Sequence, residues 1–144
     1  MKLKIRTTFS FAKLAKYVQS DSFASDMSKL LGGGIVESSR AFMKSGGVTP
    51  KLEKSTIDIR RARGTGGTTP IYETGALAKS LKAKKEGIWG LHYGKDQYEG
   101  FTTHKNSMIP NKVVPPRNFI AMDSDKMAKP INTLMKKIGK ALKK

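Results

Sequence analysis

The sequence predicts an α+β fold, in which an N-terminal strand and long helices pack on a small antiparallel β-sheet and a C-terminal amphipathic helix follows. Apolar residues recur at helical spacing in the first third and again after residue 124, and short apolar runs between turn residues lie between these regions. A chain of 144 residues is expected to form a single domain. We divide it into residues 1–47 (strand and helices), 48–123 (helix and sheet core) and 124–144 (basic helix).

The first residues have the period-two pattern of a strand. Lys2, Lys4 and Arg6 alternate with Leu3 and Ile5. Successive side chains of a strand point to opposite faces, so this pattern places the cations on one face and the apolar residues on the other. We therefore expect a strand with one face in water.

Two helices, or one interrupted helix, are expected to follow. Ser10 is placed to cap the first, and Ser20 offers a break or a second cap. Gly32–Gly34 interrupts the apolar stripe, and three glycines inside a helix would cost roughly 3 kcal/mol relative to alanine. Either the helix breaks there, or the glycines let another backbone approach closely. No Lys-Ser or Lys-Thr pair follows as in a phosphate-binding loop.

A further helix is expected to start at Thr49, with this threonine as the N-cap and Pro50 in the first helical position. It should end at Arg60, Arg61 and Arg63, where cations interact favourably with the helix dipole.

The next segment predicts a loop and a tight turn. Gly64–Pro70 is glycine-rich but lacks a phosphate-binding lysine, so it indicates a flexible loop. The hydroxyl of Thr74 can cap a short turn at Gly75, where glycine permits tight backbone passage. Leu77 and Leu81 should then point inward.

Short strands are expected next. Glu86–Gly87 predicts a hairpin turn before a strand at Ile88–Tyr93. Thr102–Asn111 reads as a polar loop. Val113–Val114 should begin the last strand, which Pro115–Pro116 confine to an edge or end.

The segment from Ser124 predicts an amphipathic helix rich in lysine, with Pro130 in its first turn or at a kink. Its pattern resembles that of helices on membrane surfaces, but we favour packing on the sheet or on another subunit. Asp123 and Asp125 indicate helix capping rather than a metal site.

The composition gives little sign of chemistry. The chain has 28 Lys and Arg against 11 Asp and Glu, a net charge of +17, which favours nucleic acid, an acidic protein or an anionic membrane as partner. It has no cysteine and only two histidines, His92 and His104, neither in a catalytic or metal-binding motif. We therefore expect no enzyme activity, no catalytic residue, no cofactor and no metal.

An ordered series of motifs between residues 48 and 125 resembles the tailed-bacteriophage head–tail joining and tail-completion proteins. Its parts are Arg60-Arg-Ala-Arg63, Thr74-Gly-Ala-Leu-Ala-Lys-Ser80 and Pro116-Arg-Asn-Phe119. The family has Arg-Pro-Phe in the last motif, so Asn118 replaces a proline. In that family the region before residue 101 supplies antiparallel strands.

The resemblance implies a structural virion protein of the phage neck, made in the host cytoplasm. It would form a ring, a hexamer or else a dodecamer, that joins the capsid portal to the tail and lets DNA pass. Its partners would be itself, portal-adaptor and tail-terminator or tail-tube proteins, with non-specific DNA contact and no membrane. The residues implied are Arg60, Arg61, Arg63 and Arg117 for contacts with a neighbour or DNA, Thr74, Gly75, Leu77 and Ser80 as a folding hinge, and Pro116 and Phe119, with Arg117, as the anchor of the last strand.

The alternative is a basic nucleic-acid-binding protein, which the charge favours. Aromatic residues do not alternate with the basic ones as a single-strand stacking surface requires, and no known DNA-binding motif is present.

Overall fold

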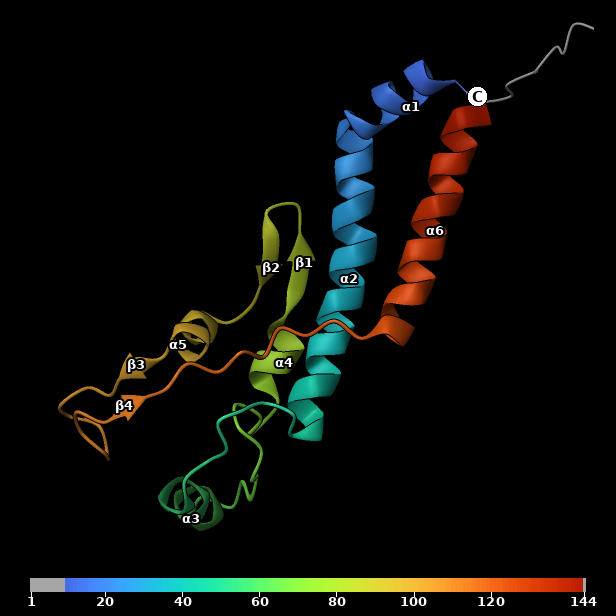
Figure 1. Cartoon of the computed structure of the whole chain (residues 1–144). Helices are drawn as coiled ribbons and strands as arrows, with labels where there is room; N and C mark the ends of the chain where they lie inside the picture. Colours follow the sequence, from blue (N-terminus) through green and yellow to red (C-terminus); the bar gives the residue numbers. More distant parts are fainter. Residues whose placement is uncertain (1–9, 144) are drawn as a thin grey trace, which may run out of the picture.

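The computed structural model describes residues 10–143 and has a mixed, broadly α+β architecture of helices with two small antiparallel sheets (Figure 1). The strand expected at residues 2–6 lies outside the described residues. The elements in chain order are α1 (Phe11–Val18), α2 (Asp21–Ser45), α3 (Lys54–Ala62), α4 (Ala76–Ser80), β1 (Lys82–Lys84), β2 (Gly87–Trp89), α5 (Tyr93–Glu99), β3 (Phe101–Thr102), β4 (Val113–Val114) and α6 (Ser124–Lys143).

Serine side chains cap the first two helices, as the sequence predicts. The Ser10 hydroxyl accepts a hydrogen bond from the Lys13 N–H at 3.4 Å, and the Ser20 hydroxyl accepts one from the Phe23 N–H at 3.2 Å. Each bond satisfies an N–H that has no partner within its helix. Helix α2 ends at Gly46, whose φ of 76° is the left-handed conformation that glycine adopts without steric cost.

The three consecutive glycines lie inside α2, so the helix does not break there. A Cβ atom added at Gly32 would lie 2.7 Å from the Ala83 Cβ on β1, and one at Gly34 would lie 2.7 Å from the Met127 Sδ on α6. A Cβ at Gly33 would meet nothing within 4 Å. Two of the glycines therefore let β1 and α6 approach α2 from different sides.

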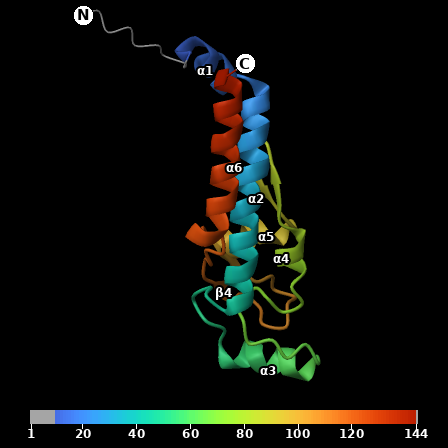
Figure 2. The same ribbon diagram turned by 90° about the vertical axis from the view of Figure 1, so that its right-hand side faces the viewer.

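Helices α2 and α6 run antiparallel and side by side (Figures 1 and 2). Leu134 of α6 is buried, and Lys137 of α6 pairs with Asp26 of α2. Pro130 lies past the first turn of α6, inside the helix. Helix α1 and the end of α6 lie together at one end of the molecule, and α3 lies at the other (Figure 2). The amphipathic helix thus packs on α2 rather than on a sheet.

The predicted cap of α6 is confirmed. The Asp123 carboxylate accepts hydrogen bonds from the Asp125 N–H at 2.9 Å and the Lys126 N–H at 3.3 Å. Its oxygen thus satisfies N–H groups at the helix start, where the dipole also favours negative charge.

The strands are shorter than the sequence suggested. Strand β1 pairs with β2 around the predicted turn, and β3 pairs with β4, each pair antiparallel. The expected strand at Ile88–Tyr93 stops at Trp89, and Tyr93 begins α5. The Leu91 N–H donates to the Ser80 hydroxyl at 3.0 Å, which turns the chain back onto α4. Antiparallel strands are therefore present before residue 101, but from Tyr93 to Glu99 a helix takes the place of the expected strand.

Helix α3 begins at Lys54, so the start predicted at Thr49 and Pro50 is wrong. In a helix starting there, the Pro50 carbonyl would accept from the Lys54 N–H. Instead it accepts a hydrogen bond from the Arg117 Nε at 3.3 Å. Val48 is fully buried and fixes the chain to the core just before this point.

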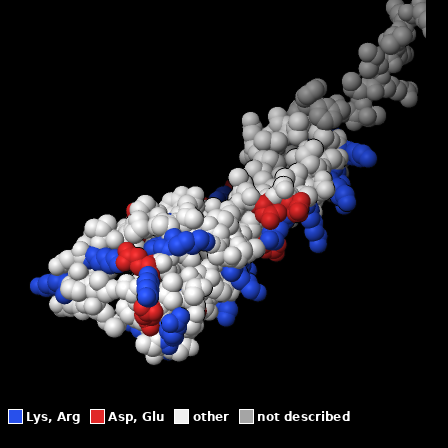
Figure 3. Space-filling model, turned by 60° about the horizontal axis from the view of Figure 1, so that its bottom comes forward, with Lys and Arg blue, Asp and Glu red and all other residues white. Residues whose placement is uncertain are grey.

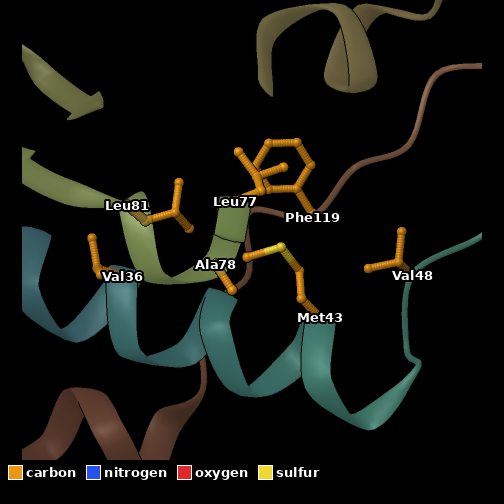
Figure 4. Close-up of a cluster of buried hydrophobic side chains, with 7 residues drawn as sticks. All are labelled: Val36, Met43, Val48, Leu77, Ala78, Leu81 and Phe119. Carbon is orange, nitrogen blue, oxygen red and sulfur yellow. The ribbon is translucent and has the colours of Figure 1, made fainter. Parts of the chain in front are cut away.

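The core joins α2, α4 and the segment after β4 (Figure 4). The Ser39 hydroxyl of α2 accepts from the Ala121 N–H at 3.0 Å and fastens that segment to the helix. Leu77 and Phe119, from the two sequence motifs, both belong to this core. The inward orientation expected of Leu77 is therefore confirmed. Its buried members are Val36, Met43, Val48, Leu77, Ala78, Leu81 and Phe119.

Candidate functional site

A cavity of about 390 Å³ lies among α3, the turn before α4, α5 and the β3–β4 hairpin. Half of the residues singled out in the sequence line it. Volumes of this size are typical of sites for small ligands or for a few side chains of a partner. The lining residues from the sequence motifs are Arg60, Thr74, Gly75, Leu77 and Arg117.

The turn before α4 forms one wall of the cavity. Gly75 has a φ of 74°, and the Thr74 hydroxyl accepts a hydrogen bond from the Ala76 N–H at 3.3 Å. A Cβ at Gly75 would lie 3.2 Å from the Tyr72 ring, so both the backbone conformation and the space favour glycine. Leu77 follows with 1% of its surface exposed. The tight glycine turn is as the sequence predicts, whereas the residue that caps α4 is Gly75 and the Thr74 hydroxyl bonds only within the turn.

Arg60 lies at the end of α3 and is only 8% exposed. Its guanidinium donates to the carbonyls of Gly67 at 3.2 Å and Thr69 at 2.8 Å, and its Nε lies 3.4 Å from a Glu73 carboxylate oxygen. Burial lowers the pKa of Arg60, and the charge of Glu73 opposes that shift. Arg60 therefore holds the loop after α3 in place and is not the flexible external contact that the sequence suggested.

Arg117 is also only 8% exposed, so it does not lie on the outer surface of the chain and is reached only through the cavity that it lines. The backbone N–H of Arg117 donates to the Gln97 carbonyl at 2.9 Å, and the side-chain Nε donates to the Pro50 carbonyl at 3.3 Å. Its two terminal nitrogens have no acceptor within residues 10–143. Burial lowers the pKa of Arg117, the positive charge of Arg60 lowers it further, and the negative charge of Glu53 opposes the shift.

Three other charged residues line the cavity. Lys112 and Glu53 form an ion pair with each other. Glu73 accepts a hydrogen bond from the Thr65 hydroxyl at 2.8 Å, besides its contact with Arg60. Sequence reasoning missed these residues, since the chain brings them together from distant segments without a shared spacing or motif.

The other predicted residues lie outside the cavity. Arg61 has 76% of its side chain exposed and lies 3.7 Å from Asp58, and Arg63 is exposed. These two remain accessible to a partner. The Ser80 hydroxyl donates to the Leu77 carbonyl at 2.7 Å, besides accepting from the chain after β2.

Pro116 is exposed and follows β4, where Gly100 comes close to the chain. A Cβ at Gly100 would lie 2.9 Å from the Pro116 nitrogen. Phe119 is buried and packs edge to face on Tyr98, with ring centroids 5.9 Å apart. The end of β4 is thus held by packing, as an anchor of the last strand requires.

A row of lysines marks α6 as a second feature. Lys129, Lys136, Lys140 and Lys143 are exposed and have no acidic partner among residues 10–143. At 100° per residue they lie within about 60° of one another, over about 21 Å of helix. Figure 3 shows Lys and Arg side chains spread along the molecule, with Asp and Glu side chains beside several of them. We call these four residues the lysine row.

Comparisons with protein-family models, with curated proteins and with solved structures find no match for the chain. Within residues 10–143, no three His, Asp or Glu side chains gather as metal ligands. No helix in the same part of the chain has the length and apolar character needed to cross a membrane.

Proposed function

We propose that the chain is a structural subunit of the neck of a tailed bacteriophage, where it forms a ring that joins the capsid portal to the tail and lets DNA pass. One observation carries the proposal. The motifs that resemble the head–tail joining proteins lie far apart in the sequence, yet Leu77 and Phe119 share one core, and Gly75 and Arg117 share one cavity. The two motifs therefore belong to one structural unit, which supports the resemblance.

Exposed apolar side chains support an assembling subunit. A ring built by one repeated contact needs two different patches on each chain. Trp89, at 51% exposure, and Leu91 lie near the β1–β2 hairpin. Ile131, at 46%, and Met135, at 61%, lie on α6. A stable contact between such patches should bury roughly 800 Å² per partner.

The proposal includes the finer architecture expected from the sequence, in which an N-terminal strand and long helices pack on the small sheet. The packing of α2 against β1 supports the helical part. We propose a hexamer, with a dodecamer as the second choice, located at the head–tail junction of the virion after synthesis in the host cytoplasm. Its partners would be portal-adaptor and tail-terminator or tail-tube proteins. No catalytic, cofactor, metal or membrane role is proposed.

Light scattering on purified protein tests the ring. The expected mass is six times the 15.8 kDa of one chain. Met135→Glu should lower this mass, because it places a charge in the apolar patch on α6, whereas Asn106→Glu, in the exposed β3–β4 loop, should not. Arg117→Glu is unsuitable here, because a buried charge reversal would report on folding. A wild-type monomer at every concentration, together with virions that lack the protein, would refute the proposal.

The lysine row favours a second candidate function, binding of nucleic acid as the main activity. Each lysine that neutralises a phosphate contributes about 0.9 to the slope of log K against log salt for duplex DNA. Replacing the four lysines with Gln should then lower the slope by about 3 to 4. A matched control removes four exposed lysines from scattered positions, namely Lys44, Lys54, Lys79 and Lys105. Equal loss in both variants would mean that the row has no special part in DNA binding.

A further inference from the structure

We infer that the cavity beside Arg117 is a binding site for a carboxylate carried on a short apolar stem. This inference does not depend on the phage assignment. It starts from the terminal nitrogens of Arg117, which line a cavity of about 390 Å³ and find no acceptor in the described part of the chain. Within residues 10–143 every side-chain nitrogen or oxygen that is shielded from solvent has a hydrogen-bond partner, so the free donors of Arg117 face the solvent of the cavity, where a ligand can reach them.

Arg117 is the one cation of the described cavity lining whose charge is not matched by a carboxylate. Arg60 is paired with Glu73, and Lys112 is paired with Glu53. The Nε of Arg117 uses a backbone carbonyl, which carries no net charge. One monovalent anion would therefore balance the cavity.

The lining favours a carboxylate over a phosphate. The two terminal nitrogens of a guanidinium form a planar fork that matches the two oxygens of a carboxylate. A phosphate carries up to two negative charges and would bring the second one close to Glu53 and Glu73, without a cation to balance it. Charge count and geometry thus point to the same chemical class.

The rest of the lining indicates an apolar stem. Aliphatic and aromatic side chains make up much of the lining, and a stem in contact with them would leave water as the carboxylate reaches Arg117. Such a ligand is either a free small carboxylic acid or an acidic side chain of a partner protein. The apolar residues that line the cavity include Leu52, Ile71, Leu77, Phe101, Ile109 and Val114.

Butyrate is a suitable probe, with butyramide as the uncharged control of the same shape. Binding to the full chain is followed by amide chemical shifts in NMR. We expect saturable shifts at residues that line the cavity and affinity for butyrate at least about tenfold above that for butyramide, a difference of about 1.4 kcal/mol.

Three variants test whether butyrate binding depends on the charge of Arg117 and on the space in the cavity. Arg117→Gln should abolish the preference for butyrate, because it removes the charge. Thr56→Met should block binding of both probes, since Thr56 lines the cavity from α3 and its hydroxyl makes no hydrogen bond within residues 10–143. Arg61→Gln should bind like the wild type, because Arg61 is exposed and outside the cavity. If Arg117→Gln does not fold, the loss of butyrate binding in Thr56→Met tests whether the ligand occupies the cavity.

Comparing butyrate binding by the assembled protein and by the monomer identifies the source of the carboxylate. If assembled and monomeric protein bind butyrate alike, the natural ligand is a free small acid. If assembly removes butyrate binding, the carboxylate comes from a neighbouring chain. Equal affinity for both probes, or butyrate binding that survives Thr56→Met, would overturn the inference. A negative result with butyrate leaves ring formation unaffected, so the two proposals fail separately.

Discussion

The glycines of α2 provide a sharp test of how the chain packs, because two neighbours have opposite surroundings. In Gly32→Ala the new Cβ would lie 2.7 Å from the Ala83 Cβ of β1. Carbon atoms pack best at about 3.5–4.0 Å, so roughly 1 Å of movement is needed. A Cβ cannot rotate away from its own backbone, and the strand must therefore move off the helix.

The magnitude follows from two opposing terms. Forcing an extra methyl into a packed contact costs about 1–3 kcal/mol. Replacing glycine by alanine inside a helix contributes about 1 kcal/mol in the other direction. Gly33→Ala gains the second term alone, because its Cβ meets nothing within 4 Å. We expect Gly33→Ala to be more stable than the wild type, and Gly32→Ala to be about 1–3 kcal/mol less stable than Gly33→Ala.

Thermal unfolding by circular dichroism, with urea unfolding at 25 °C, measures this difference. A gap of 2 kcal/mol corresponds to about 4–8 °C in Tm for a chain of this size. The m-values should agree among the variants, which shows that the folded states are equally compact. Measurements below any concentration at which the chain associates remove the contribution of assembly. If Gly32→Ala is stabilised as much as Gly33→Ala, the close approach of β1 to α2 is wrong.

Further predictions concern buried and paired charges. Arg60→Gln should lower the free energy of unfolding by about 2–4 kcal/mol, because it leaves two carbonyls and a carboxylate without their partner, whereas exposed Arg61→Gln should change it by less than about 0.5 kcal/mol in urea unfolding. The hydrogen bond from Lys137 lowers the pKa of Asp26. The stability that this pair contributes is therefore present above the unfolded pKa of about 3.9 and is lost as pH falls through the folded pKa. Asp26→Asn should reduce the drop in Tm that the protein shows in acid. Burial raises the pKa of Tyr17, and its hydrogen bond to Asp26 raises it further. Ultraviolet titration should therefore detect the ionisation of Tyr17 above the ordinary pKa of about 10. The contribution of Tyr17 to stability should be lost as pH rises through the folded pKa.

Local signals in the sequence predicted the starts of α1, α2 and α6. Ser10, Ser20 and Asp123 cap helices because their side chains bond to N–H groups two or three residues further on, which is decided within a few residues. The tight turn at Thr74 and Gly75 was predictable for the same reason.

Contacts between residues far apart in the sequence determine the features that local patterns did not predict. The start predicted at Thr49 is wrong because Arg117, far along the chain, takes the Pro50 carbonyl. Tyr93 begins a helix because the hydroxyl of Ser80 redirects the preceding segment. The cavity likewise combines segments from α3 to β4, so no spacing in the sequence announces it.

The chain enters α1 and leaves α6 at the same end of the molecule, with α3 at the opposite end (Figure 2). A fluorophore on α1 and one at the end of α6 would therefore lie at the same end of the molecule, at a distance from α3. If the chain forms the proposed neck ring, electron micrographs of virions carrying either label should show the extra density at one common height along the particle axis. Such labels would fix the polarity of the subunit without altering its folded surface.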